Sequence, residues 1–226
     1  RELAARGGTG LTRRSQYQSK EAFAKEEAKV MNIIMYEIRK RKNEIREKYK
    51  TLRAALDPKV KAGWDEAVCR SFISSATYRF ASVLLLYAPK RDEVDVMPIA
   101  RQALADGKRV AFPRCIPDTH DMVFHFVDSL SQLISGSYGL REPSSDLEVY
   151  DRGSPETAAC LVPAIVYDRR GYRIGYGKGY YDRYLSSFTG SKVGTVYSEY
   201  IVDSLPRGRY ALSVDFIVTE RGIRVK

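Results

Sequence analysis

The sequence predicts an α/β fold with three layers, in which a mostly parallel sheet carries helices on both faces, together with a basic helical extension at the N-terminus. After about residue 80, short apolar runs alternate with helical patterns, as in proteins whose parallel strands are joined by helices. The 226 residues, 44% of them hydrophobic, are enough to bury a sizeable core. The charge is uneven, because residues 1–53 hold 15 Lys and Arg against 7 Asp and Glu. We therefore expect an extension over residues 1–40, partly helical, and an α/β domain over residues 41–226.

The basic extension is compatible with several kinds of segment. Residues 1–19 combine Arg and Ser with few acidic residues, as in the remnant of a mitochondrial presequence. The excess of positive charge also suits a nucleic-acid contact or a solvated helix face. From Glu21 to about Leu56 there is no Gly or Pro, and apolar residues recur at helical spacing, which predicts one or two helices. These apolar residues are Val30, Ile33, Ile34, Ile38 and Ile45.

A second helical pattern runs from about Val60 to Tyr78, with Trp64, Val68 and Phe72 on one face. The alternating part of the chain follows it. The expected strands are Val83–Tyr87, Arg109–Phe112, Met122–Val127, Cys160–Val166, Val193–Val196 and Val214–Val218, with a helix over Met97–Ala105. Residues 135–155 are rich in Gly, Ser, Pro and acidic side chains and predict a long loop, and such loops in compact domains are often functional.

The composition also excludes some classes of protein. The longest apolar run, residues 81–88, is too short to span a bilayer, so we expect no membrane insertion. The three cysteines are odd in number and widely spaced, which indicates neither a disulfide framework nor a zinc site and fits a reducing compartment. His120 and His125 lie close together without a third ligand type at metal spacing, so we do not expect a metal pair.

The most informative segment is DRRGYRIGYGKGYYDRYL, residues 168–185. Gly175, Gly177 and Gly179 occupy every second position between an expected buried strand and a helix that starts near Tyr180. Successive backbone N–H groups can then converge on an anion, and the helix N-terminus adds partial positive charge. The spacing matches neither of the two commonest phosphate-binding glycine motifs. For a glycine run alone, a tight hairpin or loop is the alternative interpretation.

The side chains beside these glycines favour phosphate binding. Arg173 and Lys178 add full positive charges, and Asp182 supplies a hard oxygen for a Mg²⁺ ion bound to phosphates. Three tyrosines offer flat faces to a planar ligand. They are Tyr176, Tyr180 and Tyr181.

With these flanks, the string VPAIVYDRRGYRIGYGKGYYDRYL resembles the signature of the 5-formyltetrahydrofolate cyclo-ligases, also called methenyltetrahydrofolate synthetases. Lys42-x-x-x-Arg46, followed by Arg53, resembles the N-terminal helix whose Lys and Arg hold ATP phosphates in that family. Residues 92–95 resemble the segment whose first Glu contacts the folate. The middle strands and the motif at residues 138–143 follow in the family's order. The resemblance covers about residues 42–222.

The resemblance implies that ATP and Mg²⁺ are used to convert 5-formyltetrahydrofolate into 5,10-methenyltetrahydrofolate. The formyl oxygen attacks the γ-phosphate, and N10 of the same folate then displaces the phosphate, while the protein positions and neutralises charge. The resemblance assigns catalysis to Lys42, Arg46, Arg173 and Lys178, and it assigns ATP binding to the same four residues together with Gly175, Gly177, Gly179 and Tyr181. It assigns folate binding to Ala88, Glu93, Tyr138, Tyr176 and Tyr180. It assigns metal binding to Asp182.

One departure concerns the metal. The family commonly has an Asp four residues before the Asp of its final strand, and here Ala211 precedes Asp215. Alanine cannot ligate a cation, so magnesium binding is weakened, or water or Asp215 takes over. The alternative hypothesis is a catalytically weakened cyclo-ligase-like protein whose basic residues 1–53 bind an RNA-rich assembly such as a mitochondrial ribosome, although that segment has no RNA-recognition motif. The expected compartment is the mitochondrial matrix, or otherwise the cytoplasm.

Overall fold

The computed structural model describes residues 13–116, 118–136 and 139–225, with side chains from residue 22 onward. Its contacts divide the chain into two compact units, Arg1–Arg41 and Lys42–Lys226. Helix α1 (Arg13–Ala54) is continuous over 42 residues, which confirms the helix expected from Glu21. Because no Gly or Pro interrupts it, α1 ends only before Asp57-Pro58.

The helical pattern over Val60–Tyr78 forms two helices, so the single continuous helix that it predicts is wrong. In α2 (Pro58–Ile73), the carboxylate of Asp57 accepts hydrogen bonds from the first backbone N–H groups. The chain then turns, and the hydroxyl of Ser75 accepts from the Tyr78 N–H group to start α3 (Ala76–Phe80). A serine that can cap a new helix competes with continuation of the previous one.

A seven-stranded sheet with the order β12-β11-β9-β6-β1-β2-β3 forms the centre of the second unit. The inner pairs are parallel, and the edge strands β12 and β3 are antiparallel to their neighbours. This arrangement confirms the predicted mostly parallel sheet. The strands are β1 (Val83–Leu85), β2 (Arg109–Cys115), β3 (Met122–Val127), β6 (Ala158–Pro163), β9 (Ser191–Thr195), β11 (Phe216–Thr219) and β12 (Gly222–Val225).

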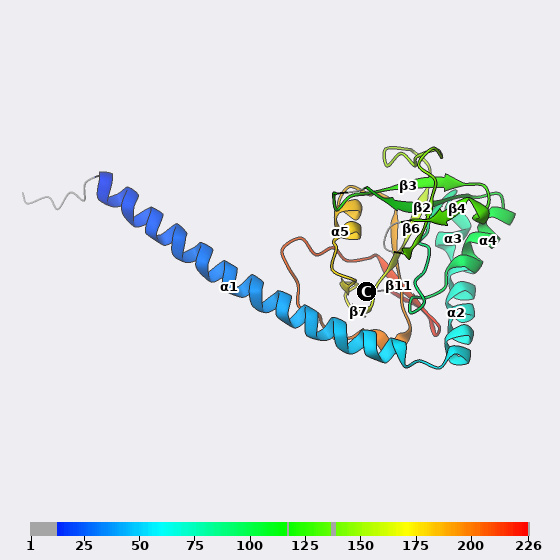
Figure 1. Ribbon diagram of the computed structural model, residues 1–226, viewed down its shortest axis with the longest axis horizontal. Helices are drawn as coiled ribbons and strands as arrows, with labels where there is room; N and C mark the ends of the chain where they lie inside the picture. The colour runs from blue at the N-terminus through cyan, green and yellow to red at the C-terminus, as the bar shows by residue number, and fades with distance from the viewer. Residues whose placement is uncertain (1–12, 117, 137–138, 226) are drawn as a thin grey trace, which may run out of the picture. The chain divides into compact units, whose positions relative to one another are not determined.

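Helices cover both faces of this sheet. Figure 1 shows α2, α3 and α4 (Met97–Ala105) on one side of the strands and α5 (Tyr180–Leu185) on the other. Phe72 of α2 and Ile99 of α4 are fully buried, and on α5 the Tyr184 ring lies 4.7 Å from that of Phe124 in β3. All three residues of β1 are buried, as expected for a strand enclosed by two helical layers.

The expected strand Cys160–Val166 is divided between two sheets. Strand β6 ends at Pro163, which has no N–H group to continue a ladder. The chain then leaves the main sheet, and β7 (Val166–Asp168) joins a three-stranded sheet with β8 (Arg173–Ile174) and β10 (Ile201–Val202). This second sheet carries the glycine segment. The sequence predicted one strand because the apolar run continues across the bend, and this prediction was wrong.

The expected loop over residues 135–155 is only partly irregular. It contains β5 (Arg141–Pro143), which pairs with β4 (Leu133–Ser135), and Val149 bridges to His125 of β3. Two short 3-10 helices, Leu130–Gln132 and Ser198–Tyr200, complete the elements of the described residues. No helix among these residues combines the length and the apolar character needed to cross a membrane.

Candidate active site

Three segments of the second unit meet around the carboxyl ends of the parallel strands β1 and β6. They are the last turns of α1 from Lys42, residues 88–95 after β1, and residues 164–182 after β6. Hydrogen bonds join the first segment to each of the other two. The carboxyl edge of a parallel sheet is where ligands of open α/β proteins bind.

The glycine segment lies between β8 and α5 in a conformation that needs glycine. Gly177 has φ of 93° and Gly179 has φ of 78°, in the left-handed region that other residues adopt only with strain. Gly177, Lys178 and Gly179 are all exposed. The backbone at residues 177–179 is therefore accessible to a ligand.

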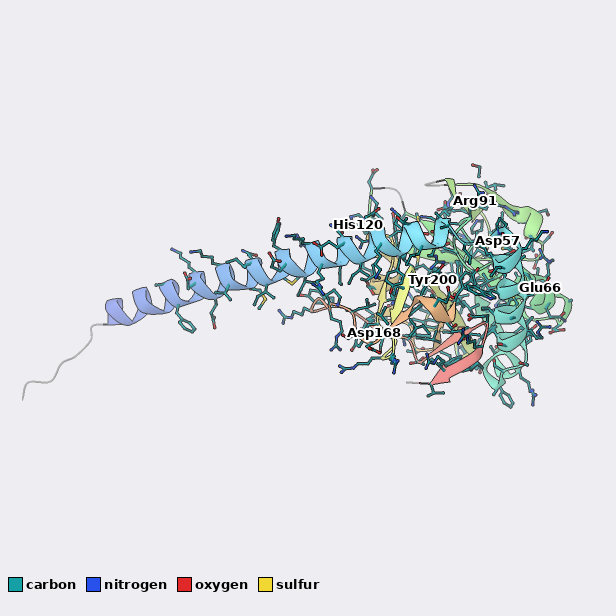
Figure 2. The ribbon with its side chains drawn as sticks, turned by 90° about the horizontal axis from the view of Figure 1, so that it is seen from below. Asp57, Glu66, Arg91, His120, Asp168 and Tyr200 are labelled. Atoms are coloured by element: carbon teal, nitrogen blue, oxygen red, sulfur yellow. The ribbon has the colours of Figure 1, made fainter. Side chains whose placement is uncertain are left out.

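Asp168 stabilises the turn between β7 and β8 that precedes the glycine segment. Its side chain is fully buried at the end of β7 (Figure 2), and it accepts hydrogen bonds from the N–H groups of Arg170, Tyr172 and Leu205. These bonds fix the turn between β7 and β8 and anchor it to the chain after β10. The carboxylate thus has a structural role, and the buried charge is satisfied by backbone donors.

Cationic side chains gather at the glycine segment. The Nε atom of Arg46 donates to the Gly175 carbonyl at 2.8 Å, and a Cβ atom on Gly177 would lie only 3.2 Å from the Arg46 guanidinium. Burial is the main cause of a lowered pKa of the Lys42 ammonium, which the charges of Arg46 and Arg173 lower further while Asp182 opposes them. The structure therefore brings together Lys42, Arg46 and Arg173, which the sequence predicted as phosphate ligands.

Arg173 and Asp182 form an ion pair across the start of α5. The guanidinium of Arg173 donates to the Asp182 carboxylate at 2.8 Å and to the Leu212 carbonyl at 3.3 Å. The Arg173 side chain is 6% exposed, whereas that of Asp182 is 46% exposed. With three cations and one carboxylate, this part of the site favours an anion such as phosphate.

The side chains around Asp182 determine how a magnesium ion could bind at this site. No group of three or more His, Cys, Asp or Glu side chains suited to a metal ion exists within the described part of the chain. Asp182 is half-exposed beside the cations, and Mg²⁺ at phosphate sites commonly takes one or two carboxylates with phosphate oxygens and waters. The residues thus fit a magnesium ion that arrives with a nucleotide, and do not fit one held by the protein alone.

Ala211 and Asp215 bear on the same question. The Asp215 carboxylate accepts from the N–H group of Lys192, and the Asp215 N–H group donates to the Lys192 carbonyl, so this residue ties the start of β11 to β9. The interpretation that Asp215 replaces the missing ligand therefore has no support here. Ala211 lies in the segment between β10 and β11, and its N–H group donates to the Gly208 carbonyl.

The residues predicted to bind folate surround a second cluster after β1. Glu93 is buried, and the desolvation raises the pKa of its carboxyl group, against the lowering effects of the Lys90 backbone N–H group and of the Lys90 and Arg53 charges. The hydroxyl of Tyr176 donates to both Asp92 carboxylate oxygens, at 2.8 and 2.9 Å. The Lys90 ammonium lies 3.5 Å from the centre of the Tyr176 ring. One face of this ring is therefore already covered by the protein.

The remaining predicted residues differ in their surroundings. Ala88 and Tyr180 are partly buried against the main core, and the Tyr180 ring lies 6.1 Å from that of His120. Tyr181 also packs against the core, and its hydroxyl is buried without a hydrogen-bond partner in the structure. The contact of Tyr181 with ATP stays a prediction. Tyr138 lies outside the described residues.

Two residues of the site were not assigned a role from the sequence, and a third makes other contacts than the resemblance implied. Lys90 and Asp92 contact Tyr176, and only Asp92 lies in a segment that the family resemblance marked. Arg53, which the resemblance placed beside the phosphate ligands, is 4% exposed and donates to backbone carbonyls instead. Arg53 lies four residues after Tyr49, and Tyr49 packs against the core. Residues four apart share a helix face, so the burial of Arg53 could have been inferred from this spacing.

Comparisons with known proteins agree on one family. Residues 38–220 match the 5-formyltetrahydrofolate cyclo-ligase family. A probable 5-formyltetrahydrofolate cyclo-ligase of Caenorhabditis elegans is 27% identical over 82% of this chain and 96% of its own length. The Saccharomyces cerevisiae 5-formyltetrahydrofolate cyclo-ligase is 30% identical over 68% of this chain and 81% of its own length. A mitochondrial member of Arabidopsis thaliana is 23% identical over 81% of this chain.

Solved structures show the same fold. The 5,10-methenyltetrahydrofolate synthetase of Aquifex aeolicus superimposes with a TM-score of 0.72 and 31% identity, covering 81% of this chain and 92% of that one. The corresponding protein of Mycoplasma pneumoniae gives a TM-score of 0.64 at 24% identity, over 79% of this chain and 98% of that one. The matched ranges include all three segments of the candidate site.

Proposed function

The chain belongs to the 5-formyltetrahydrofolate cyclo-ligase family, and we propose that it catalyses the conversion of 5-formyltetrahydrofolate to 5,10-methenyltetrahydrofolate with ATP and Mg²⁺. The observation that carries this proposal is the meeting of Lys42, Arg46 and Arg173 around the exposed glycine segment. An exposed backbone edged by three cations suits a polyphosphate. We infer the folate substrate from the matched relatives, which are named 5-formyltetrahydrofolate cyclo-ligases.

In this proposal the protein positions the reactants and neutralises the charge that moves. Arg173 is already held by Asp182 and the Leu212 carbonyl, so its guanidinium needs little reorganisation when a phosphate approaches. Arg46 is held by the Gly175 carbonyl in the same way. When bound with ATP, magnesium neutralises phosphate charge, and the half-exposed Asp182 is the carboxylate placed to contact it.

Glu93 and Tyr176 would orient the folate. The buried carboxylate of Glu93 is an acceptor for the ring N–H donors of a pterin, in a site where water cannot compete. Tyr176 links the glycine segment to Asp92 and so lies between the two halves of the site. The formyl oxygen and the γ-phosphate would then meet between these two residues and the three cations.

The direct test is the rise in methenyltetrahydrofolate absorbance when the chain is mixed with 5-formyltetrahydrofolate, ATP and Mg²⁺. We expect turnover that requires ATP and stops when the metal is chelated. Ala211→Asp should lower the magnesium concentration at half-maximal rate several-fold because it adds a carboxylate, whereas the uncharged Ala211→Asn should not. Absence of turnover in the unmodified chain and in Ala211→Asp alike would contradict the proposal.

The compartment and the partner of the basic extension stay predictions. The Arabidopsis relative is mitochondrial, and the Arg-bearing composition of residues 1–19 supports the same compartment for this chain. The hypothesis of a weakened enzyme bound to RNA rests on the charge of residues 1–53 and on Ala211, and none of the comparisons supports it.

A further inference from the structure

Arg53 lies at the end of α1 in an environment that is unusual for an arginine. Its residue exposure is 4%, although arginine is rarely buried unless it is paired. No ion pair joins it to a carboxylate among the residues that the structure describes. Its charge is instead compensated by backbone carbonyl groups and by the ring of Tyr200 at 5.4 Å, which lies beside the last turns of α1 (Figure 2). Such burial is costly and calls for a compensating role.

The hydrogen bonds of Arg53 reach two segments that are far apart in the sequence. Its Nε atom donates to the Asp92 carbonyl at 2.7 Å. One terminal nitrogen donates to the carbonyls of Ala164 and Ile165, at 2.7 and 2.9 Å. The planar guanidinium directs these donors along fixed directions, so the positions of the three carbonyls depend on one another.

Each of these contacts leads directly to predicted site residues. Asp92 precedes Glu93 and accepts from Tyr176, so the Arg53 bond fixes the peptide group that presents Glu93. Ala164 and Ile165 form the bend between β6 and β7, from which the glycine segment is reached through β8. Arg53 itself belongs to α1, the helix that carries the phosphate-side cations Lys42 and Arg46.

We infer that Arg53 is a positioning residue that fixes the spacing between two halves of the site. These are the nucleotide half, formed by Lys42, Arg46, Arg173, Asp182 and residues 177–179, and the folate half, formed by residues 88–95 and Tyr176. Arg53 does so by holding the end of α1, the segment before Glu93 and the bend after β6 with one side chain. This role rests on the proposed function. Because Arg53 is buried and donates three hydrogen bonds to backbone carbonyls, we assign it no contact with phosphate.

The electrostatic surroundings of Glu93 are consistent with this role. The charge of Arg53 lowers the pKa of the Glu93 carboxyl, against the larger effect of burial, and the charge of Lys90 acts in the same direction. Asp92 raises that pKa. Burial raises the pKa of Tyr87, Tyr176 and Tyr181, and the nearby charge of Glu93 raises it further. Arg53 therefore influences both the position of Glu93 and its ionisation.

The test compares Arg53→Lys and Arg53→Met with the matched variants Arg39→Lys and Arg39→Met, which change an exposed arginine of the same helix. Lysine keeps the charge but cannot hold three carbonyls in the fixed geometry of a guanidinium. We expect kcat to fall by roughly 10- to 100-fold in both Arg53 variants, because a shift of about 1 Å between the reactants has an effect of that size. The KM values for ATP and for the folate should change only several-fold.

Two results separate positioning from mere stabilisation. In Arg53→Met the loss of folate binding on acidification should begin at higher pH than in Arg53→Lys, because removal of a positive neighbour raises the pKa of Glu93. If kcat per folded molecule, measured below the unfolding temperature, is unchanged in Arg53→Lys while only the thermal stability falls, the inference is overturned.

Amide hydrogen exchange tests the same inference without any turnover. In the unliganded protein, exchange of both residues 90–95 and residues 164–176 should accelerate several-fold in Arg53→Lys and stay unchanged in Arg39→Lys. Unchanged exchange in either segment would overturn the positioning role. Lack of turnover in both the unmodified chain and Ala211→Asp would instead contradict the proposed function, and the exchange result would still decide the role of Arg53.

Discussion

The two halves of the site differ in how their polar groups are satisfied. In the nucleotide half, three cations face one carboxylate and the glycine segment is exposed, so charge and backbone are arranged for an anion that is not part of the protein. In the folate half, Asp92 accepts from Tyr176 and Glu93 accepts from the backbone N–H group of Lys90. The first half thus keeps an excess of positive charge beside exposed backbone, whereas the two carboxylates of the second half both have partners within the protein.

This difference has a consequence for binding. We expect ligand binding to the nucleotide half to require little rearrangement, since Arg46 and Arg173 are already held by backbone carbonyls and by Asp182. In the folate half, the Lys90 ammonium covers the Tyr176 ring, and Glu93 is buried. We therefore expect changes in the nucleotide half to act mainly on catalysis and on ATP binding, and changes in the folate half to act on both stability and folate affinity.

The largest effect is expected for Arg173→Met, which would break the nucleotide half. The variant removes a cation that is almost fully buried beside the phosphate site and leaves Asp182 without its partner. We expect kcat to fall by about 10²- to 10³-fold, as when a preorganised donor to a transition state is lost. Steady-state kinetics at saturating ATP measure it. The control is Arg169→Met, whose side chain is 67% exposed and pairs with exposed Asp203; a similar loss in both variants would contradict the assignment.

A smaller effect is expected for Gly177→Ala, which tests whether the glycine segment is shaped for phosphate. The added Cβ would lie 3.2 Å from the Arg46 guanidinium, so Arg46 must shift. We expect the KM for ATP to rise by roughly 10-fold, equivalent to about 1.4 kcal/mol. The matched control is Gly107→Ala, at φ of 72° with open space around it, because both substitutions place alanine in the left-handed region. Both should lower stability by about 1–2 kcal/mol, and a rise in KM for both would show that backbone strain is responsible.

The smallest effect is expected for Glu93→Gln, which sharpens the description of the folate half. Burial raises the pKa of the Glu93 carboxyl above its value in the unfolded chain. The protonated group therefore favours folding when the pH is below the unfolded pKa. This contribution to stability is lost as the pH rises through the folded pKa. At neutral pH the glutamine variant should therefore be more stable than the unmodified chain and should bind folate more weakly. The stability difference should shrink as the pH falls toward 4.5.

Thermal unfolding between pH 5 and pH 8 measures this difference. Exposed Glu66, labelled in Figure 2, provides the control, and Glu66→Gln should leave both the stability and the folate affinity unchanged. A Glu93→Gln variant that is less stable than the unmodified chain at neutral pH would show that the ionised carboxylate is well satisfied in its buried position.

The sequence alone determined the features that depend only on residues close together in the chain. The absence of Gly and Pro determined α1, the alternation of apolar runs and helices determined a mostly parallel sheet, and the alternating glycines marked the segment in which residues 177 and 179 have left-handed backbone. Lys42 and Arg46 lie four residues apart, so their common face on α1 follows from helical geometry. These features depend on neighbours within a few residues, which is why the chain reveals them without its fold.

Only the tertiary structure decided which of these elements meet. The bond between Tyr176 and Asp92 joins residues 84 positions apart, and that between Arg53 and Ala164 joins residues 111 apart. The division of β6 from β7 also depends on the packing around the bend. A polar side chain has several possible partners within its reach, and burial selects one, because a buried donor or acceptor without a partner is costly.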